Sequence, residues 1–194
     1  MSTDPRTGQK RCSGLIWLWL SAVILVADQI SKWMIVQSIE LYERIPVIDL
    51  LDITHLRNTG AAFSFLSDAG GWQRWFFIIL AILVTVLVVV WLSRLPARGK
   101  GWLCAALALV VGGAVGNVVD RILFGYVVDF ISVHYAGWYF PAFNVADSAI
   151  TVGAIVLLIE SVVAGDGRIE TGRGSTIIKR REPSEPVTSE KRDI

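Results

Sequence analysis

The sequence predicts a membrane all-α fold in which four transmembrane helices carry a small extracytoplasmic portion. Hydrophobic residues make up 54% of the 194 residues and charged residues only 18%, whereas a soluble domain carries about 25% charged residues. The apolar residues gather in four blocks, each near the roughly 20 residues that cross a bilayer. Lys and Arg are concentrated in alternate connections between these blocks, as expected when those connections are cytoplasmic.

The first block covers residues 15–36, and we interpret it as a retained transmembrane helix. Its charged residues are Asp28 and Lys32, and it ends in the sequence WMIV. A cleaved signal peptide has a shorter apolar region that ends in small residues at a cleavage site. The length and the bulky end of this block therefore favour a helix that stays in the membrane.

The other three blocks are also read as spanning helices. The block at 75–92 contains no charged residue, and the block at 144–164 is the fourth predicted span. The block at 102–119 is rich in glycine, and Gly112 and Gly116 lie four residues apart. Because small residues at this spacing let membrane helices approach closely, we predict that the third helix packs tightly against a neighbour.

The distribution of the 18 Lys and Arg residues predicts the orientation of the chain. Most of them lie in 1–13, 93–101 and 165–194; the exceptions are Lys32, Arg44, Arg57, Arg74 and Arg121. If the chain crosses the membrane four times, these three segments lie on the same side of it. The positive-inside rule predicts that this side is cytoplasmic. Both termini are then cytoplasmic, and segments 37–74 and 122–143 face outward.

This topology divides the chain into three parts. Residues 1–13 are a cytoplasmic N-terminal segment, and residues 14–164 are the membrane domain with an extracytoplasmic insert at 37–74. Residues 165–194 form a cytoplasmic tail whose Gly, Ser, Pro and charged residues predict disorder. The insert is too long for a simple connection, and its mixed apolar and polar sequence predicts short strands and then an interfacial stretch around Trp72 and Trp75.

Polar residues inside the predicted spans are costly, so each of them needs an explanation. Asp28 and Lys32 lie on one face of the first helix. They form either a structural ion pair whose lysine extends to the interface or a support for a nearby site. Gly113, Asn117 and Arg121 recur every four residues on the third helix, and this stripe fits either helix packing or the wall of a site.

Two aspartates follow the third span on the predicted outer side. Asp129 is flanked by apolar residues, and Asp147 would occupy the third position of a helix capped by Asn144, which is a structural explanation for its presence. Two close carboxyl groups in apolar surroundings can share one proton. The ionised member can then activate water while the protonated member donates to an amide carbonyl. Sequence spacing leaves open whether the two aspartates meet.

Five motifs occur in order between residues 28 and 148, and together they resemble lipoprotein signal peptidase, also called signal peptidase II. They read DQISK (28–32), RNTGAAFS (57–64), GGAVGNVVDR (112–121), VVDF (127–130) and FNVADS (143–148). The resemblance implies a membrane-embedded aspartic endopeptidase of the bacterial inner membrane. Such an enzyme removes signal peptides from diacylglyceryl-modified prolipoproteins by cleaving before the lipidated cysteine. It also implies that segment 37–74 forms a small β-cradle and an interfacial helix.

The resemblance further implies the residues of the site, which would lie near the extracytoplasmic face. Asp129 and Asp147 would be catalytic, and the residues that bind substrate or support the site would be Asn58, Gly113, Asn117, Arg121, Asn144, Asp28 and Lys32. The expected partners are lipid-modified prolipoproteins and membrane lipid, with no nucleic acid since the net charge is only +1. One chain would supply the whole site, so we expect a functional monomer. We expect no cofactor and no metal, because His55 and His134 are the only histidines.

Two other functions are compatible with a polar cluster in a membrane protein. A proton-coupled carrier would need a relay through the bilayer, whereas the candidate residues gather on the outer side and the second span has none. The relay would comprise Asp28, Lys32, Asp129 and Asp147. A non-catalytic assembly factor for membrane proteins would not require the intact aspartate motifs.

Overall fold

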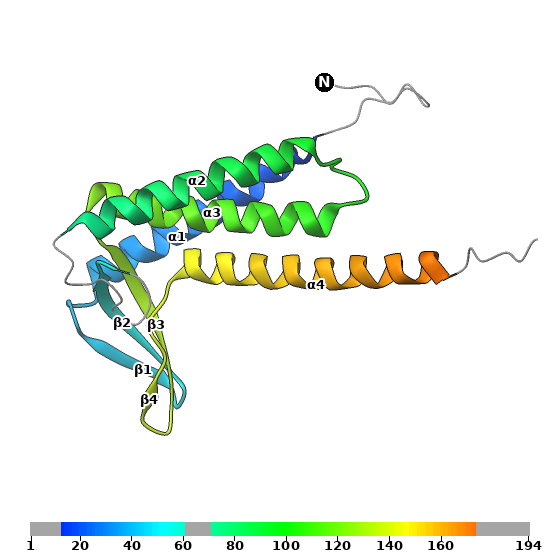
Figure 1. The fold of residues 1–194 in the computed structure, drawn as a ribbon. Helices are drawn as coiled ribbons and strands as arrows, with labels where there is room; N and C mark the ends of the chain where they lie inside the picture. Colours follow the sequence, from blue (N-terminus) through cyan, green and yellow to red (C-terminus); the bar gives the residue numbers. More distant parts are fainter. Residues whose placement is uncertain (1–12, 61–70, 174–194) are drawn as a thin grey trace, which may run out of the picture. The chain divides into compact units, whose positions relative to one another are not determined.

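The computed structural model describes residues 13–60 and 71–173, with only the backbone described for 164–173 (Figure 1). The described residues as far as Glu160 belong to one compact unit, which contains every residue of the candidate site; residues from Ser161 onward belong to a second unit. The predicted N-terminal segment lies almost entirely outside the described residues, as does the tail beyond Arg173.

Four helices in the described part are long and apolar enough to span a membrane, which confirms the predicted helical framework. A short 3-10 helix, η1 (Gly14–Trp17), leads into the first of them. The four are α1 (Leu18–Ser38), α2 (Trp72–Arg94), α3 (Gly101–Leu123) and α4 (Val145–Arg173).

Two helix boundaries differ from the prediction. The helix α4 continues to Arg173, beyond the end predicted at residue 164. The helix α2 begins at Trp72, three residues before the start predicted at Trp75, so both tryptophans lie in its first turns. The rest of the region in which an interfacial helix is predicted, residues 61–70, lies outside the described residues.

A four-stranded antiparallel sheet accompanies the helices, with the strand order β1-β2-β3-β4. The strands are β1 (Arg44–Ile48), β2 (Leu51–Asn58), β3 (Val127–Tyr135) and β4 (Trp138–Tyr139). The first two confirm the strands predicted in the insert, whereas β3 and β4 were not predicted. Pairing of β2 with β3 sets Leu56 opposite Asp129 and Asn58 opposite Val127. This pairing brings the start of the RNTGAAFS motif next to the VVDF motif at one end of the sheet.

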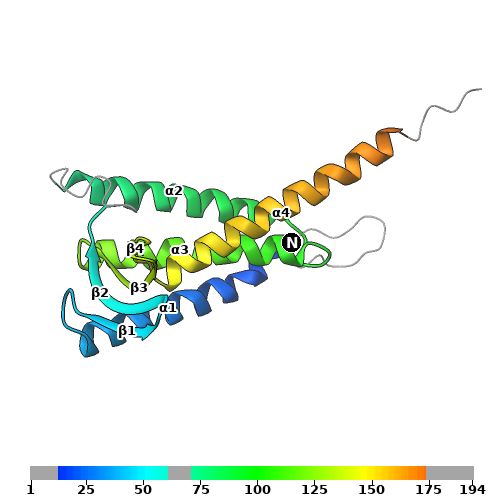
Figure 2. The same cartoon turned by 90° about the horizontal axis from the view of Figure 1, so that it is seen from below.

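The helix α3 lies between α1 and α2 (Figure 2), and its glycines allow a close approach to α1 and α4. A Cβ atom added at Gly112 would come within 2.8 Å of the Ser21 carbonyl oxygen of α1. One added at Gly113 would collide with the Ala146 carbonyl oxygen of α4. Close approach on two sides explains why α3 has many more buried residues than the other spans.

Replacing Gly113 by alanine should destabilise the protein, because its methyl group would meet Ala146 and approach Ile150 Cγ1 to 2.8 Å. Overpacking of this kind costs about 1–3 kcal/mol. Gly101→Ala in the same helix is the matched control, since its nearest neighbours would be ordinary contacts with Trp17 at 3.5 Å or more. Thermal unfolding in detergent should show a lower midpoint for Gly113→Ala alone; equal midpoints would contradict this packing.

Candidate active site

Asn144 connects the two aspartates that the sequence singles out. Its Nδ2 donates a hydrogen bond of 2.8 Å to Oδ1 of Asp129, which lies on β3. Its backbone N–H donates to Oδ2 of Asp147 at 3.3 Å, and its Oδ1 accepts from the Asp147 N–H at 2.9 Å. The predicted cap of α4 is therefore present, and the capping residue itself touches both carboxyl groups.

Two further asparagines orient the carboxyl groups, one for each aspartate. Asn58 Nδ2 donates to Asp129 Oδ2 at 2.9 Å. Asn117 Nδ2 donates to Asp147 Oδ1 at 2.7 Å. Because an amide side chain has two donors and one acceptor oxygen, each asparagine can hold a carboxylate and still bind a second group. Asn58 Oδ1 accepts from the Gly60 N–H at 3.0 Å, which fixes the turn after β2.

Arg121 places a cation beside this cluster. Its guanidinium donates to the carbonyl oxygens of Asn117 at 3.3 Å and Gly60 at 3.1 Å. The same group lies 5.0 Å from the ring centroid of Phe77 on α2, which is within the range of a cation–π contact. Arg121 thus joins α3 to the end of β2 and to α2 around one space.

That space is a cavity of about 620 Å³. Its walls come from the end of β2, from α2, α3 and α4, and from the segment before α4, and they are mostly apolar. The lining residues are Asn58, Gly60, Phe77, Arg121, Phe140, Pro141, Ala142, Phe143, Asp147, Ser148, Thr151 and Val152. An apolar cavity with a few convergent polar groups is typical of a ligand site, and here the polar groups include one of the two aspartates.

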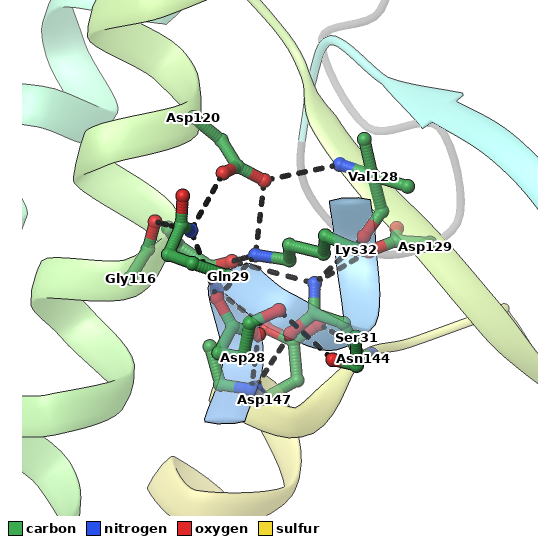
Figure 3. Close-up of polar contacts among 12 residues, drawn as sticks. Asp28, Gln29, Ser31, Lys32, Gly116, Asp120, Val128, Asp129, Asn144 and Asp147 are labelled. Carbon is green, nitrogen blue, oxygen red and sulfur yellow. Dashed lines mark hydrogen bonds and ion pairs between the residues drawn. The ribbon is translucent and has the colours of Figure 1, made fainter. Parts of the chain in front are cut away.

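Asp28, Lys32 and Asp120 form a buried ion triad next to the aspartates (Figure 3). Lys32 Nζ lies 2.8 Å from Asp28 Oδ2 and 2.9 Å from Asp120 Oδ2. All three residues are at most 3% exposed, so the alternative in which Lys32 extends to the interface is wrong. The reason is that two carboxylates and the Asn117 Oδ1, 3.1 Å from Nζ, already satisfy the ammonium group inside the protein.

The structure brings most of the predicted site residues together, and it adds two residues that were not predicted. Gly113 packs against Ala146, the residue before Asp147, and does not itself line the cavity; its role as a support of the site stays a prediction. Asp120 and Gln29 were not predicted as site residues, although Gln29 Nε2 donates to Asp120 Oδ1 at 2.9 Å. The available signal was that Asp120 lies three residues after Asn117, on the same face of a helix.

The histidines lie in the sheet. His55 Nδ1 is 2.9 Å from the Ile39 carbonyl oxygen, and His134 Nε2 is 3.1 Å from Asp52 Oδ1. These contacts assign both imidazoles to local structure in and around the strands.

Burial raises the pKa of Asp129 to about 7, and the negative charge of Asp147 adds to this rise. The hydrogen bonds from Asn58 and Asn144 and the charge of Lys32 act in the opposite direction, because they favour the ionised form. Asp129 is therefore a carboxyl group that can hold a proton near neutral pH. A second carboxyl group close by gives the arrangement an acid and a base at once.

The comparisons with a family model and with individual known proteins agree on one family. The family described as signal peptidase (SPase) II matches residues 20–163. A lipoprotein signal peptidase of Pseudomonas putida is 53% identical over 158 residues, which cover 80% of this chain and 92% of the relative. One from Pseudoalteromonas translucida is 54% identical over 149 residues, covering 77% of this chain and 89% of the relative.

Solved structures agree with this similarity. A bacterial membrane enzyme determined by the in meso method at 2.3 Å resolution has a TM-score of 0.70 and 29% identity, covering 91% of this chain and 100% of that chain. Another, determined at 1.9 Å resolution, has a TM-score of 0.65 and 34% identity, covering 75% and 91%. The four helices and the small sheet are thus shared with experimentally determined membrane enzymes.

Proposed function

Because the chain belongs to the signal peptidase II family, we propose that Asp129 and Asp147 are the catalytic pair of an aspartic endopeptidase. Family membership makes the chain a peptidase that removes signal peptides from lipoprotein precursors. The four spanning helices make it a multi-pass protein of the bacterial inner membrane. The aspartic type of catalysis and the residues that perform it are the proposal.

The observation that carries the proposal is the shared contact with Asn144, whose Nδ2 and backbone N–H each reach one of the two carboxyl groups. From this shared contact we infer that one small molecule such as water can reach both Asp129 and Asp147. Two carboxyl groups at such a site titrate as a pair and retain one proton over a range of pH. We assign that proton to Asp129, whose pKa is raised to about 7.

Hydrolysis then proceeds as follows. Ionised Asp147 takes a proton from water, the water oxygen bonds to the carbonyl carbon of the scissile amide, and Asp129 gives its proton to the carbonyl oxygen. In the collapse of the tetrahedral intermediate, Asp147 returns its proton to the leaving nitrogen as the C–N bond breaks. One hydroxyl proton of the intermediate passes to Asp129, which restores the starting protonation state.

The surroundings of the pair suit a lipid-modified substrate. The cavity beside Asp147 is mostly apolar, so it can receive an acyl chain or an apolar stretch of signal peptide. Asn58 and Arg121 supply polar groups at its wall, where an extended peptide backbone needs partners at membrane depth. We propose diacylglyceryl-modified prolipoproteins as the substrates, a functional monomer, an active site at the extracytoplasmic end of the spans and cytoplasmic termini.

The direct test replaces Asp129 and Asp147 by asparagine, one at a time. Processing of a diacylglyceryl-modified precursor is then followed by its shift in electrophoretic mobility. Loss of processing in both variants supports the pair, and normal processing by either variant overturns it.

The rate of cleavage should fall as the pH rises above about 7. The raised pKa of Asp129 means that its proton is present below pH 7 and is lost above it. Since this proton is donated to the carbonyl oxygen, each further pH unit should reduce kcat/KM about tenfold. The pH profile of the purified full chain in detergent measures this.

Asp52→Asn is the matched control for the pH profile. Asp52 is also a buried carboxyl group, at 3% exposure, but its partners are Arg44 and His134 in the sheet. This variant should keep the fall in rate near pH 7. A rate that rises through pH 7 to 9 in the unmodified chain would exclude protonated Asp129 as the acid.

A further inference from the structure

The residue that precedes each catalytic aspartate is held by a buried carboxylate. The backbone N–H of Val128 donates to Asp120 Oδ2 at 3.2 Å. The backbone N–H of Ala146 donates to Asp28 Oδ1 at 2.9 Å. Asp129 therefore directly follows a residue, Val128, that is bound by Asp120 (Figure 3). Asp147 directly follows a residue, Ala146, that is bound by Asp28.

Lys32 joins the two anchoring carboxylates through its ammonium group, at 2.8 Å from Asp28 and 2.9 Å from Asp120. The three side chains lie inside the protein, where solvent cannot replace a lost partner. Buried charges keep their pairing because separating them carries a large desolvation penalty. The spacing between the two carboxylates is thus fixed by one nitrogen atom that both of them contact.

Asp120 has both of its oxygens occupied, which fixes the orientation of its carboxylate. Oδ2 accepts from Val128 and pairs with Lys32, while Oδ1 accepts from Gln29 Nε2 at 2.9 Å. Gln29 Nε2 also lies 3.2 Å from Asp28 Oδ2. Gln29 and Lys32 on α1 therefore bind both carboxylates at the same time.

We propose that Asp120 is a positioning residue for the hydrolysis, acting with Lys32 and Asp28 to set the separation of Asp129 and Asp147. This inference rests on the proposed function of the two aspartates. Asp129 comes from a strand and Asp147 from a helix, so their separation depends on how β3 and α4 are placed. The buried ion triad connects the backbone of both elements to α1 and thereby controls a distance on which proton transfer depends steeply.

The test compares Asp120→Ala and Asp120→Asn with Ser21→Ala in the full chain in detergent. Ser21 is the matched control because it is also buried between α1 and α3, where its Oγ donates to the Ala108 carbonyl oxygen at 2.7 Å. The measurements are kcat and KM for a diacylglyceryl-modified precursor peptide, and the midpoint of thermal unfolding. Asp129→Asn is measured in parallel.

Asp120→Ala should lower kcat about 10- to 100-fold, as a misplacement near 1 Å would, with KM changed less than twofold. Asp120→Asn should retain more of kcat than Asp120→Ala, because its amide oxygen can still accept from the Val128 N–H. Ser21→Ala should keep the normal kcat even where it lowers the unfolding midpoint. If Asp120→Ala does not fold, the nearly isosteric Asp120→Asn and Asp28→Asn supply the same comparison.

A normal kcat in Asp120→Asn and Asp120→Ala, together with an inactive Asp129→Asn, would overturn the positioning role and leave the catalytic pair intact. An equal loss of kcat in Ser21→Ala at an equal loss of stability would also overturn it, since the effect would then be general to the α1–α3 contact. An active Asp129→Asn would instead overturn the proposed function on which the inference depends.

Discussion

Asp129→Asn and Asp147→Asn should each lower the rate of precursor cleavage by about 10²- to 10⁴-fold, the range that a general acid or base contributes. An amide can neither take the proton of water in place of Asp147 nor give a proton to the substrate in place of Asp129. Asparagine has nearly the same shape as aspartate, so the backbone at both positions should keep its place. Cleavage is measured on a diacylglyceryl-modified precursor with purified full-length variants.

Two comparisons make this experiment specific. Asp52→Asn removes a buried carboxylate of the sheet and should leave the rate near normal, which separates loss of chemistry from a general effect of losing a buried charge. The double variant should be little slower than either single variant, because residues that act as one unit have non-additive effects. Multiplicative losses in the double variant would show two independent roles and contradict a shared proton.

Lys32→Met should have the largest effect on stability. It removes the ammonium group between Asp28 and Asp120 and leaves two buried carboxylates without their countercharge. Breaking a buried ion pair in this way costs about 3–5 kcal/mol, a large part of the 5–15 kcal/mol that holds a typical protein folded. We expect a strongly lowered midpoint of thermal unfolding in detergent and little folded protein in the membrane.

Lys100→Met is the matched control for this substitution. Lys100 also pairs with a carboxylate, Glu160 at 3.4 Å, but its side chain is 47% exposed. Exposed pairs contribute about 0–1 kcal/mol, so this variant should unfold near the normal midpoint. Adding Asp28→Asn and Asp120→Asn to Lys32→Met should restore part of the lost stability by removing the unpaired charges. Equal midpoints for Lys32→Met and Lys100→Met would show that the ion triad does not stabilise the fold.

The helices could be predicted from the sequence because each span is a continuous apolar stretch of sufficient length. The strand β3 could not, because Val127, Val128, Asp129 and Phe130 are all buried. A strand buried on both faces lacks the alternation of apolar and polar residues that identifies strands. Its pairing with β2 is a long-range contact, and local sequence does not specify such a partner.

The candidate site, like the fold, could be predicted only in part from the sequence. The five motifs supplied the aspartates and asparagines, which the structure brings together around Asn144. They did not reveal the role of Asp120, since an acidic residue beside Arg121 at the end of a span resembles a residue of the membrane–water boundary. Only the packing of α1 against α3 shows that Asp120 is 1% exposed and paired with Lys32.

Asn144 also bears on the timing of biogenesis. Asn144, which caps the start of α4, binds Asp129 on β3, and α4 is the last of the four described spans in chain order. During synthesis, the other described elements that contact Asp129 and Asp147 are therefore made before α4. On the proposed assignment of these two aspartates as the catalytic pair, a chain in which α4 is not yet inserted lacks a complete active site, so its activity begins only when α4 is in place.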